Sequence, residues 1–353
     1  MNQESLNTDI SSEKNVLPEK NPLLEIKNLK QYFHSGKGIF KKGYTVYAVD
    51  DVSLSVNTGE TLGIVGESGC GKSTLGRSLL RLYEPTAGQI LFEGQDICQF
   101  DSKAMRSLRQ EMQMVFQDPT ESLNPRHTVG MILHEPFEIH HLGTAEERQQ
   151  WVSELLIKVG LTPEAAERYP HEFSGGQKQR IGIARAIALK PKLVVCDESV
   201  SALDVSVQAQ ILNLLMKLQQ EMDLTLIFIA HDLSVIRHIS DKIAVMYLGQ
   251  IVEYGDAQQV YQNPKHPYTQ SLLSAIPITH PKYRDAKLRM QEQGIGERIL
   301  LQGDIPSPIE RPVGCRFASR CPKVMEECRS KPPKLQSYSK HDHQVSCFLY
   351  ESH

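Results

Sequence analysis

The sequence predicts an α/β fold in which helices cover a parallel sheet. Short, mostly apolar runs recur along the chain, and helical segments lie between most of them, which is the pattern of a parallel sheet. The chain has 353 residues, of which 40% are hydrophobic and 23% are charged, so it can bury a sizeable core. This length favours one large domain or two smaller ones.

The composition excludes several classes of protein. The formal net charge is −3, so the chain lacks the basic character of a dedicated nucleic-acid binder, and we expect no nucleic-acid partner. No apolar run approaches the roughly 18 residues that span a bilayer. Residues 1–22 are polar and lack a basic start followed by an apolar stretch, which predicts a disordered tail and no signal peptide.

The expected elements follow in order along the chain. Alternating apolar residues at 24–29 and at 46–56 predict two strands joined by a Gly- and Lys-rich hairpin loop at 35–43. Further strands are expected at 61–65, 112–116, 193–196, 226–229 and 243–246, and helices from about residue 72, over 145–160 and over 178–189. Residues 118–170 carry more helix signal and could form a separate lobe. After about residue 255 Pro becomes frequent, which indicates a distinct C-terminal appendage.

A glycine-rich loop after the strand at 61–65 predicts a nucleoside triphosphate site. The loop fits G-x-x-x-x-G-K-S/T with Gly66, Glu67, Ser68, Gly69, Cys70, Gly71, Lys72 and Ser73, and Thr74 follows. Glycines let backbone N–H groups turn towards phosphate oxygens, and the helix N-terminus adds partial positive charge. Lys72 is expected to reach the β- and γ-phosphates, and Ser73 to bind Mg²⁺.

Two carboxylates, Asp197 and Glu198, directly follow the apolar run at 193–196. A central strand would deliver Asp197 beside the phosphate loop to hold Mg²⁺, and would place Glu198 as the general base for the attacking water. Alone, the pattern could equally be a strand followed by a polar turn. The phosphate loop upstream favours the catalytic interpretation.

A second glycine pair opens the helix expected at 178–189. The sequence there is Phe173, Ser174, Gly175, Gly176 and Gln177. A serine and glycines at a helix N-terminus can bind an anion or can simply cap the helix. Two phosphate-binding ends in one chain suggest that the second end covers the γ-phosphate held by a partner's loop, which requires a dimer.

Together these motifs resemble those of ATP-binding cassette (ABC) ATPases. FSGGQ is similar to the LSGGQ signature, with Phe173 in place of the usual Leu. Gln117, in VFQDP, matches the Q-loop glutamine, which in the family senses Mg²⁺ and links to the membrane partner. Asp204 ends a D-loop-like SALD, and His231 matches the switch histidine that contacts the γ-phosphate. A single His at a strand end is otherwise more often structural.

The resemblance implies roles and domain limits. It makes Glu198, His231 and Gln117 the catalytic residues, with ATP as substrate and Mg²⁺ held by Ser73, Gln117 and Asp197. It implies the ABC ATPase fold at 23–255, with a RecA-like parallel-sheet core, an antiparallel β subdomain and a helical subdomain at about 118–190, and then a Cys-rich extension at 256–353. In this family an aromatic residue upstream of the phosphate loop usually stacks on adenine. Tyr44 and Tyr47 are the candidates, with Phe33 third, although either tyrosine could be a hairpin core residue.

The chain also resembles the oligopeptide/dipeptide importer branch, which includes nickel importers, and is most similar to the second ATPase subunit of oligopeptide permeases. SLNPRHTVG at 122–130, GDIPSP at 303–308, GCRF at 314–317 and RCP at 320–322 carry this resemblance. It implies a peripheral protein on the cytoplasmic face of the membrane, paired with a homologous ATPase and two permease subunits, and served by an extracytoplasmic peptide-binding protein. A nickel or other small-solute importer and a non-transport regulatory ATPase are the alternatives.

Four of the seven cysteines cluster near the C-terminus, at Cys315, Cys321, Cys328 and Cys347. Their spacing does not match the C-x₂₋₄-C pairs of zinc sites, whereas four thiolates can hold an iron–sulfur cluster. Between residues 311 and 340 eight Lys/Arg face two Glu, a local net charge of +6 that would stabilise an anionic cluster. The resemblance implies a [4Fe–4S] cluster. Zinc and unliganded thiols are the alternatives, as are His341 and His343 as ligands, although solvated histidines are expected there.

Overall fold

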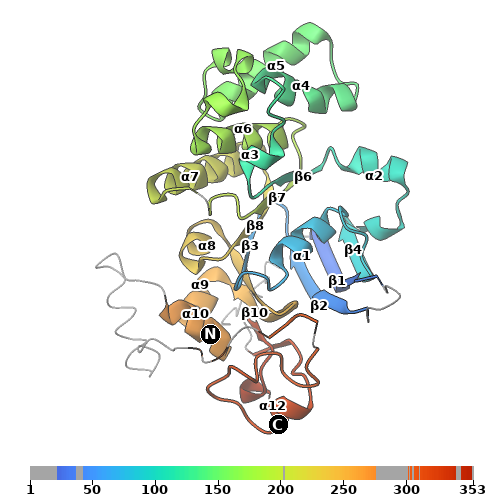
Figure 1. Cartoon of the computed structure of the whole chain (residues 1–353), viewed down its shortest axis with the longest axis vertical. Helices are drawn as coiled ribbons and strands as arrows, with labels where there is room; N and C mark the ends of the chain where they lie inside the picture. Colours follow the sequence, from blue (N-terminus) through green and yellow to red (C-terminus); the bar gives the residue numbers. More distant parts are fainter. Residues whose placement is uncertain are drawn as a thin grey trace, which may run out of the picture.

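The computed structural model describes residues 22–36, 43–201, 203–275, 301, 303, 306–309, 311–338 and 343–351. Two sheets organise these residues (Figure 1). A four-stranded antiparallel sheet has the order β2-β1-β4-β5, and an eight-stranded sheet has the order β11-β12-β10-β9-β3-β8-β7-β6. All but the last residue of the expected tail at 1–22, most of the hairpin loop and His341 lie outside the described residues.

The centre of the larger sheet is parallel, as the sequence predicts. Its strands are β9 (Lys242–Tyr247), β3 (Thr61–Val65), β8 (Thr225–Ala230), β7 (Leu193–Asp197) and β6 (Met112–Val115). Every residue of β3, β7 and β8 is buried, which is typical of strands covered by helices on both faces. Along β8, Phe228 packs in the core shared with the helices at 129–187, whereas Ile229 packs in the core shared with the antiparallel sheet.

The smaller sheet contains two strands that the sequence pattern did not predict. β1 (Leu24–His34) and β2 (Thr45–Val56) form the expected antiparallel pair, with several register irregularities. β4 (Ala87–Phe92) pairs with β1, and β5 (Gln95–Asp96) follows. Only Ile90 and Phe92 of β4 are fully buried, so its sequence carries too short an apolar alternation to be recognised.

The helices cover both faces of the parallel strands and form a lobe. The longer ones are α1 (Lys72–Leu79), α4 (Val129–Ile139), α5 (Ala145–Lys158), α6 (Gly175–Ile187) and α7 (Val205–Met222); α2 (Ser102–Leu108), α3 (Pro119–Ser122) and α8 (Leu233–Ile239) are shorter. Short 3₁₀ turns lie at Ile97–Gln99, Pro163–Glu167, Pro170–Glu172 and Phe348–Tyr350. α5 begins where Thr144 and Glu147 form a capping box, and α4 and α5 lie at the top of Figure 1.

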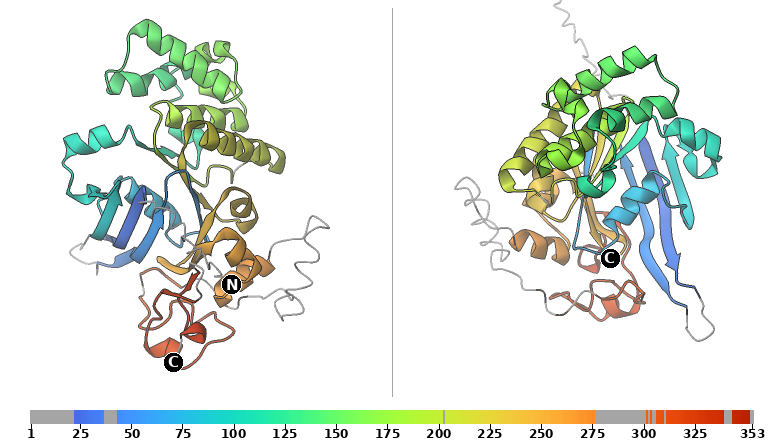
Figure 2. Two further views of the ribbon diagram at one scale, coloured as in Figure 1. Left: turned by 180° about the vertical axis from the view of Figure 1, so that it is seen from behind. Right: turned by 45° about the horizontal axis from the view of Figure 1, so that its top comes forward.

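The C-terminal segment is tied to the sheet and contains short elements of its own. β10 (Gln250–Asp256) leads to α9 (Ala257–Gln262) and α10 (Pro267–Ser274), and α12 (Glu327–Ser330), β11 (Gln336–Ser337) and β12 (Gln344–Val345) follow. β12 pairs with β10 and so extends the sheet edge. Figure 2 shows this segment at the opposite end of the molecule from α4 and α5.

Candidate active site

The phosphate loop joins the end of β3 to the start of α1, as predicted. Gly71 precedes α1 with φ 107°, a left-handed conformation that favours glycine. A Cβ atom at Gly71 would lie 2.0 Å from the carbonyl oxygen of Ala48 on β2. The loop therefore needs glycine here both for its backbone angle and for the close approach of a second chain segment.

Lys72 is buried and is satisfied within the loop. Its Nζ donates to the carbonyl oxygens of Gly66 at 2.8 Å and Glu67 at 3.0 Å, and lies 3.8 Å from Oε1 of Glu198. These are the partners that phosphate oxygens would replace. The loop thus holds the cationic group in place before any nucleotide arrives.

Ser73 and Asp197 meet at the end of β7 and have the chemistry of a Mg²⁺ site. Ser73 Oγ donates to Asp197 Oδ1 at 2.7 Å, and Asp197 is fully buried. Burial raises the pKa of Asp197, while Ser73 and Arg77 act in the opposite direction. Its second oxygen, Oδ2, accepts no hydrogen bond from the described residues, and Arg77 Nη2 lies 3.8 Å away. A buried carboxylate oxygen without a donor beside a hydroxyl fits a hard cation.

Glu198 lies between the Q-loop and the phosphate loop. Gln117 Nε2 donates to Glu198 Oε2 at 2.9 Å, and Lys72 lies on its other side. Glu198 has φ 44°, a strained conformation for a non-glycine residue, and its N–H donates to the carbonyl oxygen of Ile229 at 3.0 Å. The strained turn aims the side chain into a cavity of about 300 Å³ lined by the phosphate loop, Gln117 and Glu198.

The structure separates the aromatic candidates for the base-binding end. Tyr47 and Phe33 line the same cavity, whereas Tyr44 does not line it and is 50% exposed. Tyr47 packs edge-on against Tyr32 with ring centroids 4.9 Å apart, and its N–H donates to the carbonyl oxygen of Pro308 at 3.1 Å. Stacking on adenine stays a prediction for either tyrosine.

The signature residues lie away from this cavity. Ser174 caps α6 in a capping box with Gln177, and Ser174, Gly175 and Gln177 are exposed while Gly176 is partly buried. Asp204 caps α7 by accepting from the N–H of Val207 at 2.9 Å. His231 follows β8, is exposed and does not line the cavity.

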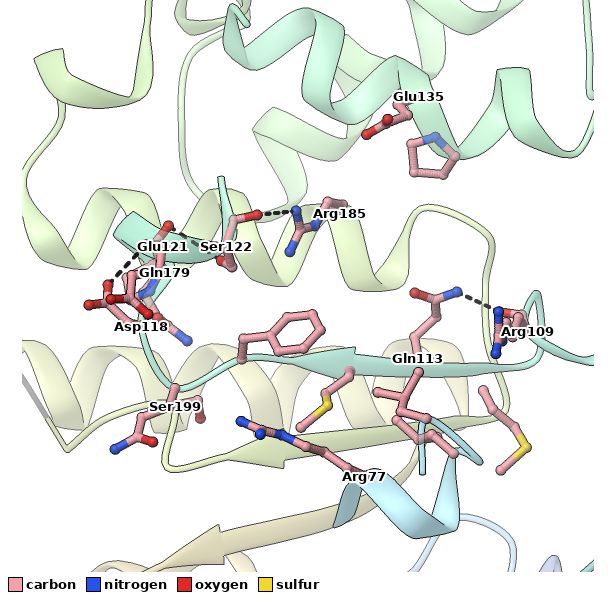
Figure 3. A pocket seen from close by; sticks show the side chains of 18 of the residues that line it. Arg77, Arg109, Gln113, Asp118, Glu121, Ser122, Glu135, Gln179, Arg185 and Ser199 are labelled. Atoms are coloured by element: carbon pink, nitrogen blue, oxygen red, sulfur yellow. Dashed lines mark hydrogen bonds between the residues drawn. The ribbon is translucent and has the colours of Figure 1, made fainter. Parts of the chain in front are cut away.

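A larger cavity of about 1330 Å³ lies beside the Q-loop (Figure 3). Glu135 on α4 and Arg185 on α6 lie on one side of it and Gln113 on β6 on the other (Figure 3), and Arg77 on α1 also lines it, from beyond β6. Arg185 Nη1 donates to the carbonyl oxygen of Ser122 at 2.6 Å, which fixes the segment after the Q-loop against the helical lobe. Phe116 and Ile139 line the cavity and are partly exposed.

The four C-terminal cysteines lie close enough to affect one another. Burial is the main cause, and Cys315, Cys321 and Cys328 the smaller ones, that together raise the pKa of Cys347 to about 12. All four are free thiols. Among the residues that the structure describes, no group of three or more His, Cys, Asp or Glu side chains is arranged to hold a metal ion. The expectation that His343 is solvated is wrong. His343 is buried, and its Nε2 lies 2.7 Å from Oε1 of the buried Glu253.

Sequence reasoning missed the contacts that the C-terminal segment makes with the phosphate loop. Arg320 forms two hydrogen bonds with Glu67, and Tyr268 accepts from the N–H of Glu67. The partners lie more than 200 residues apart in the sequence. No local motif could have revealed these pairs.

Comparisons with known proteins agree with the fold and the motifs. Residues 49–201 match the family described as ABC transporter, and residues 252–328 match the oligopeptide/dipeptide transporter C-terminal region. The chain is 53% identical to the oligopeptide transport ATP-binding protein AppF of Bacillus subtilis, covering 93% of this chain and 97% of that protein. It is 48% identical to the dipeptide transport ATP-binding protein DppF of Escherichia coli, covering 94% and 95%.

A solved structure extends the comparison. The dimeric post-hydrolysis state of the ATP-binding cassette MJ0796, bound to ADP and Pi, is 29% identical with a TM-score of 0.59, covering 66% of this chain and 98% of that one. This likeness confirms the expected ABC ATPase fold. None of the helices in the described part of the chain has the length and apolar character needed to cross a membrane. The chain belongs to the ABC transporter ATP-binding proteins, in the branch of the oligopeptide and dipeptide transporters.

Proposed function

We propose that this chain hydrolyses Mg·ATP and thereby powers the import of peptides through separate permease subunits. The observation that carries the proposal is the meeting of Glu198, Gln117 and Lys72 at one cavity, in a chain whose C-terminal region matches that of peptide transporters. Glu198 acts as the general base on the attacking water, and Gln117 orients the Glu198 carboxylate by donating a hydrogen bond to it. Lys72 would exchange loop carbonyls for phosphate oxygens, and Ser73, Gln117 and Asp197 would hold Mg²⁺, whose charge would offset that of the phosphates.

The catalytic unit is a dimer with a homologous ATPase subunit. The surface position of Ser174 and Gly175 at the start of α6 supports this, because a helix N-terminus can bind the γ-phosphate held by the other subunit. Asp204 and His231 are also exposed outside the cavity, and His231 is the switch histidine that contacts the γ-phosphate, as the family resemblance implies. Closure of the dimer then completes each site from two chains.

The larger cavity beside the Q-loop is the docking site for a permease helix on the cytoplasmic face of the membrane. Its position supports this proposal, because Gln117 lines both cavities and so joins the docking surface to the base Glu198. Partly exposed Phe116 and Ile139 supply apolar area, and Arg77 and Glu135 supply charge. A peptide-binding protein outside the membrane would deliver the substrate to the permease.

The C-terminal extension at 256–353, after the nucleotide-binding domain at 23–255, holds a [4Fe–4S] cluster on Cys315, Cys321, Cys328 and Cys347. The gathering of the four cysteines between residues 315 and 347 supports this, and so does the surrounding positive charge. Each thiolate of such a cluster binds its own iron, so the four need not converge on one ion as they would for zinc. Iron and acid-labile sulfide are expected in anaerobically purified protein, and their absence would defeat this assignment.

The experiment that tests the proposed function is peptide-stimulated ATP hydrolysis. The tagged chain is purified from native membranes with its associated subunits and reconstituted in liposomes with the peptide-binding protein. We expect oligopeptides to raise ATP turnover, and the Glu84→Gln variant, altered at an exposed carboxylate, to respond like wild type. Stimulation by Ni²⁺ and not by peptide would instead favour a nickel importer, and a chain that carries no permease with it would favour a regulatory ATPase.

A further inference from the structure

The second residue of the phosphate loop is held from outside the loop by the C-terminal segment. Arg320 Nη1 donates to Glu67 Oε2 at 2.7 Å, and Nη2 donates to Oε1 at 3.0 Å. Tyr268 on α10 accepts from the N–H of Glu67 at 2.8 Å, and Lys72 donates to its carbonyl oxygen at 3.0 Å. Side chain, N–H and carbonyl of Glu67 therefore each have a fixed partner.

The surroundings of Arg320 keep this pair in one geometry. Arg320 is 8% exposed and Glu67 is 24% exposed. Arg320 also lies 3.4 Å from the hydroxyl of Tyr247, which packs against Tyr268 and Phe317. A two-point guanidinium–carboxylate contact in a half-dry site is geometrically specific and stronger than a single hydrogen bond.

The charge on Glu67 gives the pair a consequence for nucleotide binding. A carboxylate within a loop that receives a triphosphate repels the ligand unless a cation neutralises it. Arg320 supplies that cation and belongs to the cysteine segment, where it directly precedes Cys321. Arg316 of the same segment bonds to Leu248 and to buried Asp50, and Leu248 lines the cavity.

We propose that Arg320 is a positioning residue for ATP binding, which neutralises Glu67 and fixes the backbone of the phosphate loop from the C-terminal segment. The proposal rests on the ATP site proposed above. It makes the affinity for ATP depend on a residue outside every recognised nucleotide motif. It also ties the cysteine segment to the catalytic end of the molecule.

The test is calorimetric titration of the full chain with Mg·ATP. We expect Arg320→Ala to weaken binding about tenfold, because the carboxylate of Glu67 is left unpaired in the phosphate loop, next to Ser68, which lines the cavity. Adding Glu67→Gln to Arg320→Ala removes the unpaired charge and should restore affinity to within about threefold of wild type. Arg320→Lys keeps the charge without the two-point contact, so its affinity for Mg·ATP should lie between those of Arg320→Ala and wild type.

Two readouts separate this role from general support of the fold. Raising salt from about 0.05 to about 0.5 M should reduce the difference in Mg·ATP affinity between Arg320→Ala and wild type, because salt screens the repulsion between Glu67 and the phosphates. The matched control is Lys331→Ala, which removes an exposed ion pair with Glu327 in the same segment and should leave affinity unchanged. Thermal melts identify any variant that is not folded.

The outcomes are distinguishable. If wild type binds Mg·ATP and Arg320→Ala binds equally well, the inference is wrong while the proposed ATP site stands. If the double variant binds as weakly as Arg320→Ala, charge neutralisation is not the role of Arg320. The same conclusion follows if the difference in affinity between Arg320→Ala and wild type does not depend on salt. If wild type does not bind Mg·ATP, the proposed function fails first.

Discussion

The loop at 66–73, with Asp197 and Glu198, forms the phosphate end of the site. His266, Tyr268 and Arg320 form a C-terminal wall that supports this loop. The two regions are built in different ways. At the phosphate end, Lys72 bonds to the carbonyl oxygens of residues five and six positions before it, and Asp197 and Glu198 follow one strand. At the C-terminal wall, Arg320 reaches Glu67 across 253 residues, and Tyr268 reaches it across 201. The residues of the phosphate end can thus each be recognised from a local motif, although Ser73 and Asp197 meet across 124 residues, whereas no local motif marks Arg320 or Tyr268. Loss of the base at the first region should abolish turnover, whereas changes at the second should alter ATP affinity or stability without removing a reacting group.

The largest expected effect belongs to the phosphate end. Glu198→Gln keeps the contact with Gln117 but removes the base, so ATP turnover of the assembled complex should fall by about 10²-fold or more. ATP should still bind, and the dimer should be trapped closed. Phosphate release under single-turnover conditions measures this, with Glu84→Gln as the control; unchanged turnover would sink the assigned base.

The next effect concerns the backbone of the loop. Gly71→Ala introduces a Cβ atom against the Ala48 carbonyl at a left-handed position, and should lower the free energy of unfolding by about 2–4 kcal/mol. Gly69→Ala is the matched control, since Gly69 has φ 79° but no described atom within 4 Å of the added Cβ, and about 1 kcal/mol is expected. Urea denaturation without nucleotide compares them. Equal losses would show that the approach of β2 does not constrain the loop.

The motifs explain why most of the site is predictable from the sequence. The loop at 66–73, the pair Asp197 and Glu198, and Gln117 each sit at the end of a strand, where a local pattern fixes their place. The contacts of Arg320 and Tyr268 are not predictable in this way, because they depend on how distant segments pack. The aromatic residue is intermediate, since irregular register between β1 and β2 decides which side chains line the cavity.

The buried His266 in the C-terminal wall should make the stability of the chain depend on pH. His266, which is fully buried, accepts from the N–H of Tyr268 through Nδ1, and burial lowers its pKa from 6.5 to about 3. The unfolded chain therefore takes up a proton that the folded chain refuses, so stability falls as pH drops below 6.5. This histidine should account for about 2 kcal/mol of loss between about pH 7 and pH 5.

The measurement is urea unfolding at both pH values for wild type, His266→Gln and the exposed His171→Gln. The first variant should lose this part of the pH dependence, and the second should keep it. The same slope in all three proteins would show that His266 titrates in the folded state as it does in the unfolded chain.

The smallest expected change in stability is at Asp197, where a substitution should stabilise the chain and yet abolish its function. Asp197→Asn removes a buried charge whose pKa is raised by burial, so the nucleotide-free chain should gain about 1 kcal/mol of stability at neutral pH while losing Mg²⁺-dependent hydrolysis. Because the wild-type carboxyl becomes neutral as pH falls through its raised pKa, the gain should shrink in acid. Thermal melts at neutral and acid pH check both statements, and a destabilised variant at neutral pH would contradict them.

Uptake of a labelled oligopeptide by the native cell tests the central claim most directly. The intact gene is compared with Glu198→Gln at equal expression, with Glu84→Gln as the control for substitution itself. The account predicts that uptake is lost with Glu198→Gln and kept with Glu84→Gln. Normal peptide uptake with Glu198→Gln would contradict the claim that hydrolysis by this chain powers peptide import.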